Sequence, residues 1–364
     1  MGTNVCSDTL VIVMAGGQGS RFWPLSRAAM PKQFLSINDD GESLIRSTVR
    51  RIEPLVGEGN VRVIAKPSLH ALIREHVPNA GILSEPSAKN TAACIGLAAV
   101  HALADRPGGD PTLIILPADH AIKDEEKLRE ALAEGVLRAR SSDCLVTIGI
   151  PPTQPHTGYG YIKRGALVEG RSHKVERFFE KPSLERAEKY LESGGFFWNS
   201  GMFVWRASVI LKAFQSYLPQ MYDGLMEIQR ALAASKEGEA TKRIEEIFNS
   251  FESISIDFGV LEHARNCVVV CADEFGWNDV GSWDQWAQNF KVDGDGNLIR
   301  GDAIAIDSVD CVIKASDRLV AAVGLKDIVV IDTGDALLVV SRDSVQEVRK
   351  VVDELKRRKR LELI

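Results

Sequence analysis

In the first 150 residues, short runs of consecutive apolar residues alternate with helix-like stretches. The apolar runs are LVIVM at 10–14, VRVIA at 61–65, GILS at 81–84, TLIILP at 112–117 and CLVTIGI at 144–150, and the helix-like stretches are 43–52, 90–104 and 126–140. Strands that are apolar on both faces and alternate with helices indicate a parallel sheet that helices cover on both sides. We therefore predict an α/β fold with a doubly wound, mostly parallel, Rossmann-like sheet, whose ligands bind at the carboxyl ends of the strands.

The sequence pattern changes after residue 150. TGYGYIKRG and HKVERFFEKP are typical of strands with turns, and polar helical segments fill roughly 206–250. From residue 297 short β runs such as DIVVIDT and ALLVVS follow one another, and the charged helical stretch SVQEVRKVVDELKRRKR comes last. We predict an α/β domain over 1–290 and a small β-rich segment with a terminal helix over 297–364.

Composition excludes some classes of function and location. The net charge of -6 argues against broad binding to nucleic acid, which depends on basic surface. No apolar run approaches membrane-spanning length, and no signal peptide is visible. The six cysteines include no CxxC pair, so we expect buried thiols in a reducing compartment and a cytoplasmic location.

A glycine-rich loop directly follows the first predicted strand. Gly16, Gly17 and Gly19 let backbone approach a ligand closely, and successive N–H groups in such a loop form an anion-binding nest. The loop is neither a GxxxxGK[ST] phosphate loop nor a GxGxxG dinucleotide loop, since Phe22 stands where the third glycine belongs. A tight turn without a ligand is the alternative, but the cations Arg21 and Lys32 favour an anion.

Two aspartates follow predicted strands farther along the chain. Asp119 in LPADHAI comes after TLIILP, and Asp279 in FGWNDVGSWD comes after CVVVC. Two carboxylates at strand ends suit Mg²⁺, which takes oxygen ligands in octahedral geometry. Asp119 alone could be a turn residue or a helix N-cap, and His120 is expected to be a hydrogen-bonded neighbour rather than a metal ligand.

Residues in four other segments suit the binding of a polar, phosphorylated ligand. FFEKPS offers Glu180 to accept from hydroxyls and Lys181 as a point charge for phosphate, although a surface ion pair is the alternative. FWNSGMFVW offers Asn199 as donor and acceptor, and TGYGYI offers Gly158 for close approach, with Gly160 beside it. EPSAKNTAACI leads into a helix, so Asn90 there is also a plausible N-cap.

The segment GGQGSRFWPLS followed by PKQFL resembles the signature GGxGxRxxPLTxxxPK of the sugar-phosphate nucleotidyltransferases. The tryptophan in FWPLSR and the PKQFL ending are most similar to the bacterial mannose-1-phosphate guanylyltransferases, also called GDP-mannose pyrophosphorylases. The other segments quoted above occur in family order, so the resemblance covers nearly the whole chain. One mild departure is Ser20, where the family loop often has threonine.

The resemblance implies a reaction and a role for each segment. Mannose 1-phosphate would attack the α-phosphate of GTP, giving GDP-mannose and pyrophosphate with Mg²⁺ as cofactor. Arg21 and Lys32 would be catalytic, holding the triphosphate and stabilising the leaving group. The nucleotide would bind Gly16, Gly17, Gly19, Glu85, Pro86 and Asn90; the sugar phosphate would bind Gly158, Glu180, Lys181 and Asn199; the metal would bind Asp119 and Asp279. The choice of guanine rests on the resemblance alone.

Family relatives also end in a β-helix-like segment that helps form dimers. We therefore predict a homodimer whose contact includes 297–341, a monomer with a folded-back tail being the alternative. The sequence has no room for the isomerase domain of some relatives, so no isomerase activity is expected. Alternative functions are the same chemistry on glucose 1-phosphate with UTP or dTTP, or a non-catalytic regulatory homologue that binds nucleotide sugars. An NAD(P) dehydrogenase is disfavoured by the missing third glycine.

Overall fold

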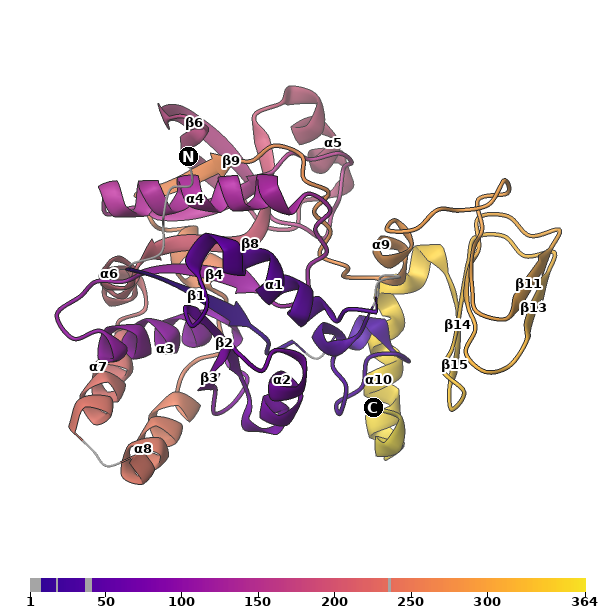
Figure 1. Cartoon of the computed structure of the whole chain (residues 1–364). Helices are drawn as coiled ribbons and strands as arrows, with labels where there is room; N and C mark the ends of the chain where they lie inside the picture. Colours follow the sequence, from indigo (N-terminus) through magenta and orange to yellow (C-terminus); the bar gives the residue numbers. More distant parts are fainter. Residues whose placement is uncertain (1–7, 18, 37–40, 235–236) are drawn as a thin grey trace. The chain divides into compact units, whose positions relative to one another are not determined.

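The computed structural model describes residues 8–17, 19–36, 41–234 and 237–364, which form two compact units (Figure 1). The sheet unit consists of Thr48–Ala118, Ile122–Trp277 and the described residues before Gly17. The loop unit consists of Gly17–Ser47, Asp119–Ala121 and Asn278–Ile364. The glycine-rich loop therefore packs with the C-terminal segment. The predicted division of the chain between 290 and 297 stays a prediction.

The sheet unit is built on a sheet with the strand order β3-β2-β1-β4-β8-β5-β9-β7-β6. Its strands are β1 (Thr9–Met14), β2 (Val61–Ala65), β3 (Gly81–Ser84), β4 (Thr112–Pro117), β5 (Leu145–Ile150), β6 (Tyr161–Glu169), β7 (Ser172–Phe179), β8 (Phe196–Arg206) and β9 (Cys267–Cys271). Among these strands only β7 and β8 run against the others, because β1 to β5, β9 and β6 share one direction through the pairings. The sheet is thus mostly parallel, as predicted.

Helices cover both faces of this sheet. They are α1 (Leu44–Val56), α2 (His70–His76), α3 (Asn90–Asp105), α4 (Glu125–Ser141), α5 (Leu184–Ser193), α6 (Ala207–Tyr217), α7 (Pro219–Ala234) and α8 (Glu237–Asn249). Phe203 and Trp205 of β8 pack in the core with α3, α6 and α7, whereas Val204 between them faces Gly135 of α4. Since side chains alternate along a strand, α4 covers the opposite face.

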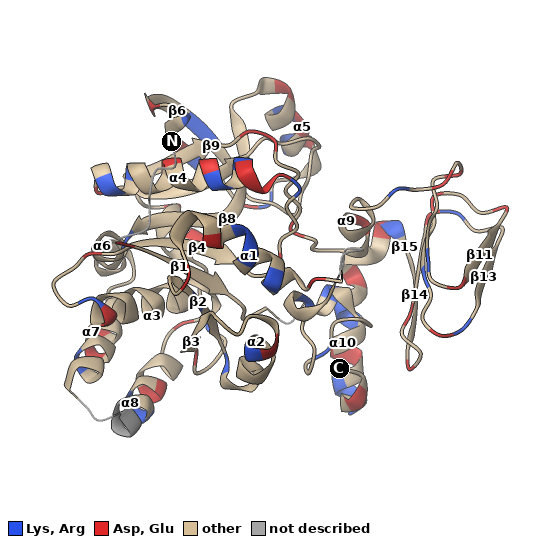
Figure 2. Cartoon of the chain, viewed as in Figure 1, with Lys and Arg blue, Asp and Glu red and all other residues tan. Residues whose placement is uncertain are grey.

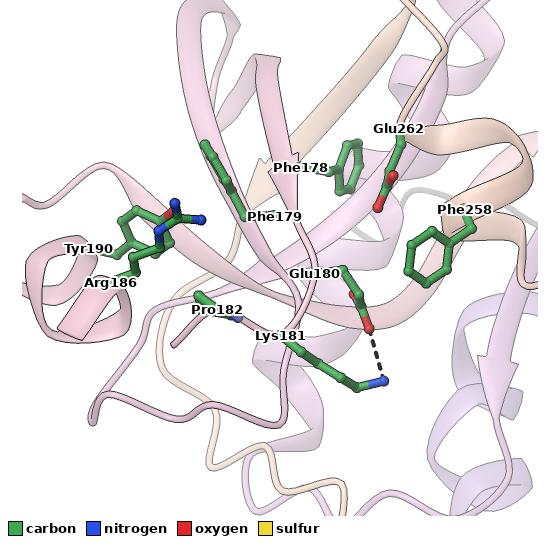
Figure 3. A pocket seen from close by; sticks show the side chains of 9 residues that line it. All are labelled: Phe178, Phe179, Glu180, Lys181, Pro182, Arg186, Tyr190, Phe258 and Glu262. Carbon is green, nitrogen blue, oxygen red and sulfur yellow. Dashed lines mark ion pairs between the residues drawn. The ribbon is translucent and has the colours of Figure 1, made fainter. Parts of the chain in front are cut away.

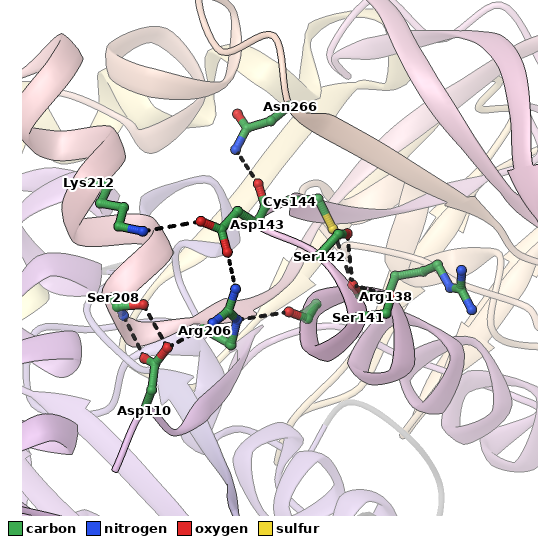
Figure 4. Close-up of polar contacts among 11 residues, drawn as sticks. Asp110, Arg138, Ser141, Ser142, Asp143, Cys144, Arg206, Ser208, Lys212 and Asn266 are labelled. Carbon is green, nitrogen blue, oxygen red and sulfur yellow. Dashed lines mark hydrogen bonds and ion pairs between the residues drawn. The ribbon is translucent and has the colours of Figure 1, made fainter. Parts of the chain in front are cut away.

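A network of charged and polar side chains joins the beginnings of β4, β5 and α6 (Figure 4). Arg206 pairs with Asp143 and, at 3.2 Å, with Asp110. Asp110 also accepts from the backbone N–H of Ser208 at 2.9 Å, which satisfies a free N–H in the first turn of α6. Lys212 completes the network 3.1 Å from Asp143. This network lies at the strand ends opposite to those where ligands are expected.

The C-terminal part of the loop unit is a stack of short strands. Parallel β10 (Leu298–Arg300), β12 (Val312–Lys314) and β14 (Ile328–Asp332) are extended by antiparallel β15 (Leu337–Ser341), while β11 (Ala303–Ile306) pairs with β13 (Val320–Val323). The helices α9 (Trp283–Ala287) and α10 (Arg349–Arg357) pack with the strands around a core that includes Phe22, Trp283, Ile331 and Val348. This arrangement confirms the predicted β-helix-like appendage.

Several predictions from the sequence can be compared with the described residues. The strands at 61–65, 81–84 and 112–117 have the predicted bounds. The terminal helix is shorter than expected, because 3₁₀ geometry covers Arg342–Val348 and the α-helix begins at Arg349. It carries both acidic and basic residues (Figure 2). The five cysteines in the described ranges are buried free thiols, and Cys6 lies outside those ranges. Among the described residues no helix is long and apolar enough to cross a membrane.

Candidate active site

The glycine-rich loop is folded tightly within the loop unit. Gly19 has a φ of 62° and begins a 3₁₀ turn, Ser20–Phe22. A Cβ atom at Gly19 would lie 2.5 Å from Cβ of Lys32 and 3.1 Å from Oγ of Ser26. Both the left-handed backbone and this contact require glycine. Gly17 is exposed, and a Cβ there would meet open space, so Gly17 leaves the loop backbone accessible.

Lys32 brings the two predicted metal ligands together. Its side chain is buried, and its ammonium donates to Oδ2 of Asp119 at 2.8 Å and to the backbone oxygen of Asp279 at 2.7 Å. Burial alone would raise the pKa of Asp119, but Lys32, with His120, holds that pKa below its ordinary value. Two oxygen donors from separate turns therefore converge on one cation position, which the ammonium occupies.

Local hydrogen bonds fix the two turns that carry Asp119 and Asp279. Ala121 and Asn278 exchange backbone hydrogen bonds of 2.8 and 3.0 Å, which join the two turns. Oδ1 of Asp279 accepts from Nε2 of Gln285 at 2.7 Å, and Gly281 leaves room for the carboxylate, since a Cβ there would lie 2.8 Å from it. The Asp279 carboxylate is thus held in place by α9 and by its own turn.

Arg21 differs from Lys32 in its surroundings. It follows Gly19 by two residues and is exposed, and no ion pair or hydrogen bond joins its side chain to any residue the structure describes. A guanidinium in this state is available to a phosphate, with which it can form two parallel hydrogen bonds. The structure therefore supplies two cations around the loop, one buried and paired and one exposed.

Glu85 is a buried carboxylate at the carboxyl end of β3. Its side chain is 3% exposed, and no hydrogen bond to it is found among the described residues. Burial raises the pKa of Glu85 to about 7, against the opposing effect of Lys66. A Cβ at Gly16 would lie 3.3 Å from Oε2 of Glu85, so the start of the glycine-rich loop lies beside it. Pro86 follows at once and is partly buried.

Asn90 begins α3 and has a left-handed φ of 66°. The side-chain oxygen of Asn90 accepts from the N–H of Thr91 at 2.8 Å and so satisfies a free N–H at the start of the helix. The N-cap position itself is occupied by Lys89. The Thr91 hydroxyl in turn accepts from the N–H of Ile256 at 2.8 Å. The segment 85–95 is therefore joined to the chain that leads into Asp257.

Two of the four predicted sugar-phosphate residues lie together at one cavity of the sheet unit (Figure 3). Glu180 and Lys181 line a cavity of about 490 Å³ and form an ion pair of 3.1 Å. Gly160 allows this packing, because a Cβ there would lie 2.7 Å from Oε2 of Glu180 and 3.5 Å from Cβ of Asn199. Gly158 is exposed, and its N–H donates to Nδ1 of His156 at 3.1 Å. It is not among the residues that line the cavity.

Asn199 is oriented by neighbours on both sides of its amide. Oδ1 accepts from the Thr147 hydroxyl at 3.2 Å, and Nδ2 donates to Oδ1 of Asp257 at 2.7 Å. Burial raises the pKa of Asp257 to about 6, and the charge of Glu180 adds to this increase, while the hydrogen bond from Asn199 opposes it. No sequence motif marks Asp257 as a site residue. It lies in a single π-helical turn, Asp257–Leu261, which has no periodic pattern to mark it.

Aromatic rings lie beside these residues. Tyr159 stacks on His156 at 3.8 Å and contacts the rings of Trp198 and Trp277, each at 5.1 Å between ring centres. The indole N–H of Trp198 is buried and has no hydrogen-bond partner in the described part of the chain. Tyr159 therefore belongs to an aromatic cluster, whereas Tyr161 is fully buried.

Residues 10–294 match the family described as nucleotidyl transferase, and residues 291–355 match the MannoseP isomerase/GMP-like β-helix domain. The chain belongs to the nucleotidyl transferase family. Every predicted site residue of this nucleotidyltransferase lies within the first match, and the second match covers most of the β-rich segment.

This nucleotidyltransferase is similar to proteins with a narrower name. It is 40% identical over 363 residues to a mannose-1-phosphate guanylyltransferase of Salmonella muenchen, a match that covers 98% of this chain and 75% of that protein. It is 38% identical over 355 residues to that of Escherichia coli, with 95% and 73% covered. A crystal structure from Thermus thermophilus, described as a mannose-1-phosphate geranyltransferase, has a TM-score of 0.86 and 36% identity, covering 96% of this chain and all of that one. The predicted fold and enzyme class are confirmed.

Proposed function

We propose that this nucleotidyltransferase transfers GMP from GTP to mannose 1-phosphate, giving GDP-mannose and pyrophosphate. The observation that carries the proposal is the resemblance to mannose-1-phosphate guanylyltransferases over nearly the whole chain. The cluster of Lys32, Asp119 and Asp279 supports it, because this cluster provides the charges that nucleotidyl transfer requires. A regulatory homologue without activity would have no need of it.

The chemistry makes one phosphoanhydride bond and breaks another. An oxygen of the sugar phosphate forms a bond to the α-phosphorus of GTP, and the bond from this phosphorus to the bridging oxygen of the β-phosphate breaks. The electron pair of that bond leaves with pyrophosphate. The substrate supplies the nucleophile, so catalysis depends on positioning and on cations that stabilise the developing charge. Arg21 and Lys32 supply two of these cations.

Enzymes of this family generally use a divalent metal, and we assign Mg²⁺ to Asp119 and Asp279. The donor chemistry fits, because Asp119 and Asp279 carry hard carboxylate oxygens on two turns that backbone hydrogen bonds join, and the ammonium of Lys32 bonds to both residues. When bound, the ion would neutralise phosphate charge. No group of three or more acidic, histidine or cysteine side chains suited to a metal is found among the described residues, so substrate phosphates and water would complete the coordination.

Glu85 is the residue that we assign to the guanine base. The Watson–Crick edge of guanine presents two adjacent donors, N1–H and the N2 amino group, and a carboxylate can accept from both. Adenine presents one donor beside an acceptor, and uracil presents one N–H between two carbonyls, so a buried carboxylate would be left poorly paired. Glu85 is buried without a hydrogen-bond partner in the described residues and lies beside Gly16, which makes it suited to this role.

The sugar phosphate is assigned to the group around Glu180. The Glu180 carboxylate can accept from sugar hydroxyls, and Lys181 is largely exposed and can pair with the phosphate. Asn199 retains an N–H for the sugar, because its other N–H is used by Asp257. Gly158 would let the backbone approach the sugar closely, because it has no side chain.

A panel of nucleoside triphosphates and sugar 1-phosphates, followed by pyrophosphate release, tests this proposal. The highest kcat/KM is expected for GTP with mannose 1-phosphate. A higher value for glucose 1-phosphate with UTP or dTTP would favour the alternative substrate pair. No release with any pair, from protein that binds GDP-mannose in calorimetry, would favour the regulatory homologue.

We also propose a homodimer formed through 297–341, with a cytoplasmic location as predicted. The paired strands β11 and β13 expose Ile304, Ile306 and Val323, with 46%, 50% and 60% of their surfaces accessible. Apolar side chains in neighbouring positions on paired strands form a patch that a second copy can cover. Closed two-fold symmetry is the default arrangement for such a contact.

A further inference from the structure

Trp23 forms hydrogen bonds through both its side chain and its backbone within the loop unit. Its indole N–H donates to the backbone oxygen of Leu363 at 2.7 Å, which joins the signature loop to a residue 340 positions away in sequence. Its own backbone oxygen accepts from the indole N–H of Trp283 at 3.2 Å. Trp23 is 6% exposed; its bond with Trp283 is buried, and its bond with Leu363 is partly buried. A buried polar group that loses its hydrogen-bond partner destabilises the protein. These bonds therefore favour one placement of Trp23.

The residues next to Trp23 connect it to the two cations. Trp23 directly follows the turn Ser20–Phe22 that contains Arg21, and its N–H donates back to the oxygen of Ser20 at 3.3 Å. The centre of the Phe22 ring lies 4.7 Å from that of Trp283 and 5.6 Å from the ammonium of Lys32. A shift of Trp23 would therefore move the turn that carries Arg21 and the ring beside Lys32.

Trp283 also extends the connection to Asp279. It begins α9, and Gln285 on the same helix donates to the Asp279 carboxylate at 2.7 Å. Trp23 and the segment 361–364 thus lie at one end of a continuous set of contacts, and the groups assigned to the triphosphate and the metal lie at the other.

We propose that Trp23 is a positioning residue, through which the segment 361–364 sets the placement of Arg21 and Lys32 for the pyrophosphate part of the substrate. The proposal rests on the function proposed above. Trp23 has no assigned contact with substrate and acts through its neighbours. A small misplacement of catalytic cations can cost up to about 100-fold in rate, so the loss of one anchoring bond is expected to be visible in kinetics.

The kinetic test uses Trp23→Phe, which removes the indole N–H and keeps an aromatic ring. We expect kcat/KM for GTP to fall about tenfold and the KM for pyrophosphate in the reverse reaction to rise, while the KM for mannose 1-phosphate changes less than about twofold. Trp283→Phe should reproduce this pattern in weaker form. The matched control is Trp205→Phe, a fully buried tryptophan of the sheet unit whose indole N–H has no partner among the described residues. Wild-type kinetics in a folded Trp23→Phe protein, or an equal fall in Trp205→Phe, would overturn the proposal.

Hydrogen exchange gives a second test that does not depend on the proposed substrates. The N–H groups of Leu363 and Ile364 donate to Arg360 and Leu361 at 3.2 and 3.3 Å. Inorganic pyrophosphate should slow their exchange in the wild type and have less effect in Trp23→Phe, because coupling between two sites is reciprocal. Unchanged exchange at 361–364 with saturating pyrophosphate contradicts the proposal. If the wild type makes no GDP-mannose, the proposed function fails, and this exchange measurement still decides the role of Trp23.

Discussion

Glu85→Gln should change how stability depends on pH. Glu85 is 3% exposed, faces Lys66 and the thiol of Cys94, and has a pKa raised by burial from 4.5 to about 7. The folded protein therefore holds this proton more tightly than the unfolded chain does. The stability that this contributes is present below about pH 4.5 and is lost as the pH rises through about 7. The shift corresponds to about 3 kcal/mol in the free energy of unfolding.

Glutamine has the same shape but no charge at any pH. The variant therefore does not lose the stability that the wild type loses as the pH rises and Glu85 ionises. We expect Glu85→Gln and wild type to have similar free energies of unfolding near pH 4.5 and the variant to be more stable by about 3 kcal/mol at pH 8. Urea unfolding at both pH values measures the difference, with Glu126→Gln on the exposed surface of α4 as the control. A difference in the free energy of unfolding between Glu85→Gln and wild type that does not vary with pH would show that the pKa of Glu85 is not raised by folding.

Three further predictions concern the site and the assembly. Lys32→Ala should lower kcat by roughly 10²- to 10³-fold, since a preorganised cation is lost; a wild-type rate in the folded variant would rule out this role. Asp279→Asn should raise the Mg²⁺ concentration for half-maximal activity, and an unchanged Mg²⁺ titration would exclude Asp279 from the metal site. Ile306→Lys with Val323→Lys should convert the dimer to a monomer in light scattering, whereas Leu167→Lys, an equally exposed change in the sheet unit, should not; a wild-type monomer would contradict the dimer.

The strands and helices of the sheet unit were predictable because their signals are local. TLIILP is apolar at every position after its first, as a strand buried on both faces must be, and it forms β4 with the predicted bounds. The terminal helix was predicted too long because charged residues at helical spacing do not distinguish an α-helix from the 3₁₀ turns of Arg342–Val348. That Asp119 and Asp279 lie near each other could also be predicted from the sequence, since both aspartates follow strands that end at the same edge of the sheet.

Contacts between side chains far apart in sequence could not be predicted. The ammonium of Lys32 between Asp119 and Asp279 depends on a fold that brings together residues 87 and 247 positions apart. The hydrogen bond from Trp23 to Leu363 is accepted by a backbone oxygen. Every residue has a backbone oxygen, so the sequence does not mark this acceptor. Asp257 was missed because its importance comes from the amide of Asn199 and from burial, neither of which leaves a motif.

In the proposed reaction the sugar phosphate attacks the α-phosphate of GTP. Mannose 1-phosphate labelled with ¹⁸O in its phosphate oxygens, incubated with GTP and the protein, tests this by mass spectrometry of both products. We expect GDP-mannose to retain all of the label, including the oxygen that bridges its two phosphates, and pyrophosphate to contain none. Label in pyrophosphate, or pyrophosphate release without labelled GDP-mannose, would contradict the proposed reaction.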